Sequence, residues 1–215
     1  MNKIIAIDGP AGSGKGTIAK LLSEKLQYVY IDSGATYRCV ALACLRNNIK
    51  LEEEEKIIEL TKTLDINFTL DGKTILNGED VSNLIRSKEV TDIVSQVSSI
   101  VKVREILVDL QRKMASNSNV IMEGRDITTV VFPNADYKFY LDASVKVRAE
   151  RRFIQNEKMG IKTSMEEIIQ NIEMRDFNDM HKPVGSLMRT KEQIYIDSSN
   201  MSIDEVVNEM IKHIK

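Results

Sequence analysis

A glycine-rich stretch near the start of the chain constrains the fold more than any other feature. GPAGSGKGT, at residues 9–17, follows the short apolar run IIAID and precedes TIAKLLSEKL, whose apolar residues are spaced as on one face of a helix. Strand, glycine-rich turn, lysine and helix in this order predict a phosphate-binding loop, because the turned-in N–H groups, the helix start and Lys15 all attract an anion. The loop departs from the usual pattern at Gly16, where serine or threonine is expected.

The other apolar runs predict an α/β fold. YVYID is followed by the apparent turn SGAT and the helical pattern YRCVALACLRNN, and VIM, YKFYLD and QIYID are further short runs with helical patterns between or after them. About five strands alternating with helices favour a mostly parallel sheet that is covered on both faces. Ser202 and Glu205 predict a capping box at the start of the last helix.

One stretch breaks the alternation of strands and helices. DINFTLDGKTILNGEDV carries alternating Ile66, Phe68 and Leu70, together with an Asp-Gly and an Asn-Gly pair, which are strong signals for tight turns. We expect a small antiparallel insert here, followed by a long helical region. The glutamates at residues 52–55 are expected to open an earlier helix, where negative charge suits the helix dipole.

Composition excludes several classes of protein. The chain of 215 residues is long enough for one core with a subdomain. Its 30 Lys and Arg residues are balanced by 32 Asp and Glu residues, and this balance argues against nucleic acid as the main partner. The run IIAI is too short for a signal peptide or a membrane span, so a cytoplasmic protein is expected. Cys39 and Cys44 are interpreted as small buried residues, and His181 and His213 form no metal-spaced cluster.

Arginines follow the predicted strands. If the acceptor is itself a phosphate, it is largely ionised at neutral pH and needs no strong base, but two anions must be brought together. Arg38 in DSGATYR and Arg125 in EGRD each follow a strand, at the edge where open α/β sheets bind ligands. These positions predict a site for phosphoryl transfer between small molecules.

An ordered set of motifs resembles the bacterial cytidylate kinases. DSGATYR, NGEDV, SQVSS, VRE, EGRDITTVVFP and MRDFND occur in that family's order and approximate spacing, and with GPAGSGKGT they cover nearly the whole chain. GKGT alone resembles only the broader group of nucleoside-monophosphate kinases. The resemblance implies ATP-dependent phosphorylation of CMP to CDP, and of dCMP to dCDP, with ATP and Mg²⁺ and without nucleic-acid or membrane partners; a monomer is expected.

The resemblance also implies an architecture and a set of site residues. It implies one kinase domain with a five-stranded parallel P-loop sheet (core 1–62, 86–147 and 186–215), a monophosphate-binding insert at about 63–85 and a helical lid at about 148–185. The residues implied as catalytic are Lys15, Arg125, Arg148 and Arg175. Those implied for ATP are Gly9, Pro10, Ala11, Gly12, Ser13, Gly14, Lys15, Gly16, Thr17, Arg151 and Arg152. Those implied for CMP are Ser33, Tyr37, Arg38, Ser95, Arg104, Arg125, Asp126, Arg175, Asp179 and Lys182.

Several points stay open at this stage. No direct protein ligand of Mg²⁺ is assigned, although Glu123 could assist the metal. Lys182 stands where the family pattern has arginine, either as a phosphate ligand or as an exposed lid lysine, and Thr128 replaces the common glycine of GRDxGTVV. The rival functions are a kinase for UMP or AMP and, in another class, a nucleotide sensor or a P-loop motor.

Overall fold

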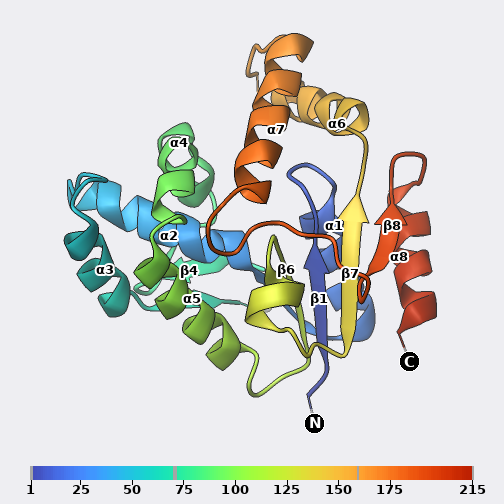
Figure 1. Ribbon diagram of the computed structural model, residues 1–215, viewed down its shortest axis with the longest axis horizontal. Coiled ribbons are helices and arrows are strands. Elements are labelled where there is room, and N and C mark those ends of the chain that lie inside the picture. Colours follow the sequence, from blue (N-terminus) through green and yellow to red (C-terminus); the bar gives the residue numbers. More distant parts are fainter. Residues whose placement is uncertain (1, 70–71, 159, 215) are drawn as a thin grey trace. The chain divides into compact units, whose positions relative to one another are not determined.

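Five strands form the main sheet of the computed structural model, which describes residues 2–69, 72–158 and 160–214. They pair in the order β2–β6–β1–β7–β8 and comprise β1 (Ile4–Asp8), β2 (Val29–Asp32), β6 (Val120–Gly124), β7 (Tyr137–Asp142) and β8 (Ile194–Asp197). Strands β1 and β7 run parallel, with Ile5 opposite Tyr137, and β8 runs parallel to β7 (Figure 1). The predicted five-stranded parallel sheet is confirmed.

Helices follow or separate these strands. They are α1 (Lys15–Leu26), α2 (Ser33–Arg46), α3 (Glu54–Thr63), α4 (Lys88–Val97), α5 (Val101–Met114), α6 (Val145–Lys158), α7 (Met165–Met180) and α8 (Ile203–His213). Two short segments are the 3₁₀-helix η1 (Leu84–Arg86) and the π-helix η2 (Ile127–Val131). Within the described part of the chain, no helix has the length and apolar character needed to cross a bilayer.

The chain divides into two compact units. Met1–Asn2 and Val29–Val120 form the middle unit, and Lys3–Tyr28 and Ile121–Lys215 form the phosphate-loop unit. Each unit has an apolar cluster of its own.

Helix α2 organises the middle unit and begins earlier than the sequence suggests. SGAT was expected to be a turn, but α2 starts at Ser33 because the Asp32 side chain accepts a hydrogen bond from the Ala35 N–H and caps the helix. The helix packs against α3, α4 and α5. Cys39 and Cys44 are buried on it as free thiols, as predicted.

The expected antiparallel insert is present in the middle unit. Its strands are β3 (Ile66–Phe68), β4 (Thr74–Leu76) and β5 (Glu79–Asp80), with Ile66 opposite Leu76. Asn77 and Gly78 have φ of 50° and 83°, so the predicted tight turn joins β4 to β5. Leu70, from the alternating run, and Asp71, from the first predicted turn, lie outside the described residues. The long helical region that follows is divided into α4 and α5.

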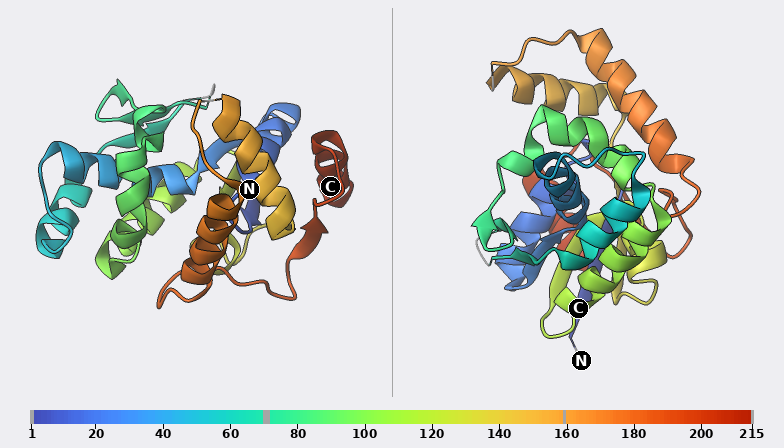
Figure 2. Two further views of the ribbon diagram at one scale, coloured as in Figure 1. Left: turned by 90° about the horizontal axis from the view of Figure 1, so that it is seen from above. Right: turned by 90° about the vertical axis from the view of Figure 1, so that its left-hand side faces the viewer.

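The phosphate-loop unit holds β1 and β7 at its centre, with Ile5, Ile7 and Phe139 fully buried. Helices α1 and α8 contact each other, and α8 begins with the predicted capping box, in which Ser202 and Glu205 cap each other's N–H groups. Helices α6 and α7 follow each other in the chain and pack together, crossing as Figures 1 and 2 show; we call this pair the α6–α7 hairpin. Ala149, Ile168 and Ile172 form a small apolar core of this hairpin.

Candidate active site

The predicted phosphate-binding loop connects β1 to α1. Gly9 has φ of 153°, and a Cβ there would lie 2.0 Å from the Leu141 carbonyl oxygen, so a larger residue would displace the loop from β7. Gly14, with φ of 95°, is the N-cap of α1, and none of the described side chains caps this helix. The first N–H groups of α1 therefore remain available to bind an anion.

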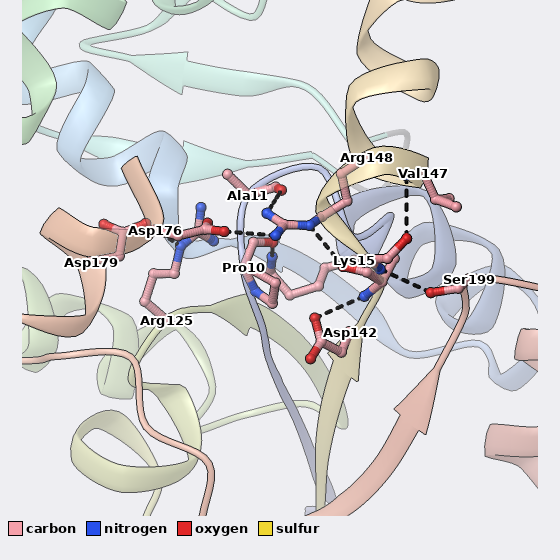
Figure 3. A network of polar contacts seen from close by, with 12 residues as sticks. Pro10, Ala11, Lys15, Arg125, Asp142, Val147, Arg148, Asp176, Asp179 and Ser199 are labelled. Atoms are coloured by element: carbon pink, nitrogen blue, oxygen red, sulfur yellow. Dashed lines mark hydrogen bonds and ion pairs between the residues drawn. The ribbon is translucent and has the colours of Figure 1, made fainter. Parts of the chain in front are cut away.

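Three cations hold carbonyl groups of the loop. Lys15 Nζ donates to the Pro10 carbonyl at 2.8 Å, and Arg148 Nη1 donates to the Ala11 carbonyl at 3.0 Å (Figure 3). Arg151 Nη1 donates to the Ser13 carbonyl at 3.3 Å. Because these carbonyl oxygens are bound by cations, the loop presents positive charge to a ligand and is restrained in one conformation.

Lys15 is buried in a positively charged part of the site. The residue is 4% exposed, and burial, together with the nearby charges of Arg125 and Arg175, lowers the pKa of Lys15 to about 7, although the carboxylates of Glu123 and Asp8 oppose the shift. An anion beside Nζ would favour the charged form and restore the ordinary ammonium. The lysine is therefore set to respond to a bound phosphate.

Arg148 is tied to the protein itself. Its Nε donates to the Ala143 carbonyl at 2.8 Å, and its Nη2 lies 2.7 Å from Asp176 Oδ2, so the side chain joins α6, α7 and the loop. Arg151 is held in a similar way by the Ser198 carbonyl, whereas Arg152 is exposed and donates to Gln155. Contact of these three arginines with a substrate stays a prediction.

Asp179 brings two further predicted residues together. Arg125 Nε lies 2.7 Å from its Oδ2, and Lys182 Nζ lies 3.1 Å from its Oδ1. Burial alone would raise the pKa of Asp179, but Arg125 and Lys182 overcome this and hold it at about 2. The side chain of Lys182 is 13% exposed, so the alternative of an exposed lid lysine is wrong.

A second arginine cluster lies in the middle unit. Arg38 Nη2 is 2.6 Å from Asp32 Oδ2, and Arg86 Nη2 is 3.4 Å from the same oxygen. Burial favours the protonated acid, but Arg38 and Arg86 lower the pKa of Asp32 below its usual value. Sequence reasoning missed Arg86, because its partner precedes it by 54 residues and nothing local marks the pair.

Tyr37 and Arg104 also meet in the middle unit. The Arg104 guanidinium lies 5.3 Å from the centre of the Tyr37 ring, and its Nη1 donates to the Ser98 carbonyl at 3.1 Å. Both residues are buried, and Ser33 is buried in the first turn of α2. Ser95 is exposed on α4.

Comparison with known proteins assigns the family. The family model described as cytidylate kinase matches residues 5–215. The chain belongs to the cytidylate kinase family. A cytidylate kinase of Desulforamulus reducens is 47% identical over 212 residues, covering 98% of this chain and 96% of that protein. A cytidylate kinase of Lysinibacillus sphaericus is 44% identical over 211 residues, covering 97% and 94%. The resemblance inferred from the motifs is confirmed.

Solved structures support the fold. A shikimate kinase of Bacteroides thetaiotaomicron has a TM-score of 0.52 and 12% identity, covering 99% of this chain and 98% of that one. An uncharacterised protein of Eubacterium ventriosum has a TM-score of 0.55 and 13% identity, covering 99% and 98%. At such identities the likeness concerns the kinase-like fold, and the cytidylate kinase assignment comes from the sequence relatives.

The residues predicted to read the base of a cytidylate kinase substrate lie in both units. Asp126 is buried in the phosphate-loop unit, where its carbonyl accepts from the N–H groups of Val130 and Val131. Ser95 and Arg104 lie in the middle unit, so the joint reading of a base by the three residues stays a prediction.

Glu123 lies near the end of β6 and raises the pKa of Lys15. The described residues contain no group of three or more metal-binding side chains.

Proposed function

We propose that the protein transfers the γ-phosphoryl group of ATP to CMP, forming CDP and ADP, and that it converts dCMP to dCDP in the same way. The single observation that carries this proposal is the whole-chain match to cytidylate kinases, at 44–47% identity to the two relatives described above. The anion-binding loop beside buried cations is consistent with it. By its substrates it is a cytoplasmic enzyme of pyrimidine nucleotide metabolism.

The chemistry needs charge neutralisation more than a general base. A phosphate oxygen of CMP attacks the γ-phosphorus of ATP, and the bond to the bridging oxygen of the departing ADP breaks. The second pKa of the CMP phosphate is about 6, so the nucleophile is already ionised at neutral pH. The barrier lies in bringing the two anions into line, which buried cations can lower.

The proposal assigns a role to individual residues of each unit. Lys15 and the N–H groups of the loop bind the phosphates of ATP, and Arg125, Arg175 and Lys182 neutralise the transferred group. Asp179 supports the proposal because it holds the cations of Arg125 and Lys182 in fixed positions. Arg38, backed by Asp32, binds the CMP phosphate.

Mg²⁺ fits this site as a companion of the nucleotide. Gly16 has no side-chain oxygen, and the Asp8 carboxylate already accepts hydrogen bonds from Ile127 and Thr128, so neither is a ready ligand. Glu123 is the candidate for a contact through water. When bound, the ion would supply positive charge that offsets the charge of the nucleotide phosphates.

Two segments are proposed to move or to select substrate. Residues 148–185 act as the lid, which is supported by the small separate core of the α6–α7 hairpin. Residues 63–85, the antiparallel insert, help to bind the monophosphate.

We also propose that the enzyme works as a monomer on small molecules, without nucleic acid or membrane. Light scattering of the purified protein tests the monomer directly.

A coupled assay for ADP release tests the function. CMP, dCMP, UMP and AMP are supplied one at a time with ATP and Mg²⁺, and the Lys15→Met variant serves as the inactive control. We expect kcat/KM to be highest for CMP and dCMP, and kcat to fall at least roughly 100-fold in the variant, because Lys15 acts on charge that develops in the transition state.

The same assay separates the rival functions. A higher kcat/KM for UMP or AMP would assign the enzyme to another monophosphate. ATP turnover without any monophosphate that exceeds the CMP-dependent rate would favour the sensor or motor.

A further inference from the structure

A buried carboxylate lies directly before the phosphate-binding loop. Asp8 ends β1 and is fully buried, and its Oδ1 accepts from the Ile127 N–H at 2.8 Å. Its Oδ2 accepts from the Thr128 N–H at 2.8 Å and from the Thr128 hydroxyl at 2.6 Å. Three donors from one segment therefore fix the last residue before Gly9.

The Thr128 hydroxyl has a second partner. Gln193 Nε2 donates to Thr128 Oγ1 at 2.5 Å. Since a hydroxyl has one proton and can accept at the same time, Thr128 donates to Asp8 while it accepts from Gln193. The hydroxyl thus connects three segments that are far apart in the sequence.

Gln193 belongs to the chain that returns from α7 to β8. Its Oε1 accepts from the Thr190 N–H at 2.6 Å, and its Nε2 also lies 3.3 Å from the Met188 carbonyl. The same returning segment is attached to α7 by the bond from the Leu187 N–H to the Asp179 carbonyl, 2.8 Å long. These hydrogen bonds, joined by the peptide bond between Leu187 and Met188, therefore lead from the end of α7 to Asp8.

The neighbouring threonine provides a comparison. Thr129 Oγ1 is buried and has no hydrogen-bond partner among the described residues, whereas Thr128 Oγ1 has two. The family motif quoted above has glycine at position 128, and glycine could supply neither bond. This arrangement thus depends on a side chain that the common pattern lacks.

We propose that Thr128 is a positioning residue for phosphoryl transfer, whose hydroxyl holds the foot of the phosphate-binding loop, the Arg125 segment and the chain returning from α7 in one arrangement. Asp8 adjoins Gly9, whose backbone lies so near Leu141 that an added Cβ would be 2.0 Å from the Leu141 carbonyl oxygen. Arg125 stands two residues before Ile127, so movement of this segment would displace its guanidinium. In-line transfer tolerates little displacement, since about 1 Å can cost roughly 100-fold in rate. The inference rests on the proposed phosphoryl transfer.

Steady-state kinetics of Thr128→Val, Thr128→Ser and the matched control Thr129→Val test the proposal. Valine keeps the shape of threonine without its hydroxyl, so we expect kcat to fall by roughly 10- to 100-fold, with a smaller change in KM for CMP. Serine restores the hydroxyl and should keep kcat within about threefold of wild type, as should Thr129→Val, a difference below about 1 kcal/mol.

A double-mutant cycle with Gln193→Leu separates positioning from general stability. Both substitutions interrupt the same set of hydrogen bonds, so the double variant should be no slower than Thr128→Val by more than about threefold. The proposal would be overturned if the fold-losses in kcat of the two single variants multiplied in the double variant. Wild-type kcat in folded Thr128→Val, or equal losses in the valine and serine variants, would also overturn it.

Two further results are informative. If Thr128→Val does not fold, Gln193→Leu takes its place: a loss of kcat supports the proposal, and wild-type kcat overturns it. Failure of the proposed function is distinguishable, because it would appear as absence of CMP-dependent ADP release in the wild-type protein.

Discussion

Arg148 and Asp176 form a buried ion pair that joins α6 to α7, with 2.7 Å between Nη2 of the arginine and Oδ2 of the aspartate. The guanidinium also donates to the carbonyls of Ala11 and Ala143. The pair thus connects the helical hairpin to the phosphate-binding loop. Its loss should therefore lower the free energy of unfolding, whatever its effect on catalysis.

Arg148→Met should lower the free energy of unfolding by about 3 kcal/mol, because it leaves the Asp176 carboxylate and two carbonyl groups without their donor. Urea unfolding followed by circular dichroism measures this change. Arg152→Met is the matched control: Arg152 is exposed, and its removal should change the free energy by less than about 0.5 kcal/mol. Equal stabilities of the two variants would contradict the structural role of Arg148.

Lys15 should make stability depend on pH in an unusual direction. Burial lowers the pKa of Lys15 from 10.5 to about 7, so between these values the unfolded chain binds a proton that the folded protein does not. The contribution of Lys15 to the free energy of unfolding should therefore be lowest below pH 7. It should rise between pH 7 and pH 10.5, by at most about 1.4 kcal/mol per pH unit.

Lys15→Met removes this titration and serves as the reference. Urea unfolding of both nucleotide-free proteins at pH 6, 7, 8 and 9 gives the difference in free energy at each pH. We expect the wild type to gain on the variant above pH 7. A difference that stays constant over the whole range would show that Lys15 keeps its ordinary pKa.

Lys182 should contribute positive charge to phosphoryl transfer. Lys182→Ala removes a cation that contacts Asp179, and we expect kcat to fall by roughly 10- to 100-fold. Lys182→Arg should retain or raise kcat, because the guanidinium can bind phosphate through two parallel hydrogen bonds. Lys146→Ala, at an exposed lysine of α6, controls for loss of charge alone. The idea fails if Lys182→Ala matches wild type in kcat and in KM for CMP.

Asp126 should govern the choice between cytosine and uracil. Cytosine offers an amino donor where uracil offers a carbonyl acceptor, and a carboxylate pairs with the first and repels the second. Polar matching of this kind can discriminate by roughly 10⁴. Asp126→Ala should lower kcat/KM for CMP and reduce the ratio of kcat/KM for CMP to that for UMP. An unchanged ratio in a folded variant would assign base selection to other residues.

The local parts of the fold were predictable because their signals are local. The glycine-rich loop, the Asn77-Gly78 turn and the Ser202 capping box each depend on a few adjacent residues. The start of α2 was misjudged because SGAT has the composition of a turn, and capping by Asp32 overrides it. Both signals at this helix start are local, and the cap supplied by the adjacent Asp32 decides the outcome.

Contacts across long sequence distances were not predictable in the same way. Arg86 contacts Asp32 and Arg125 contacts Asp179, and the members of each pair are 54 residues apart in the sequence, where no spacing rule relates them. Such pairs arise when the sheet and the α6–α7 hairpin bring side chains together. Motif order could nominate the arginines, but it could not say which of them bind the protein's own carboxylates and carbonyls.

The two cysteines of α2 have a consequence for handling the protein. Burial raises the pKa of Cys39 to about 12 and that of Cys44 to about 11, so almost no thiolate exists at neutral pH. Oxidants and alkylating reagents act on thiolates, and both side chains are shielded from solvent. Labelling by a maleimide would then proceed only as fast as α2 becomes accessible. The labelling rate of the native thiols would thus report the opening of the middle unit without an engineered probe.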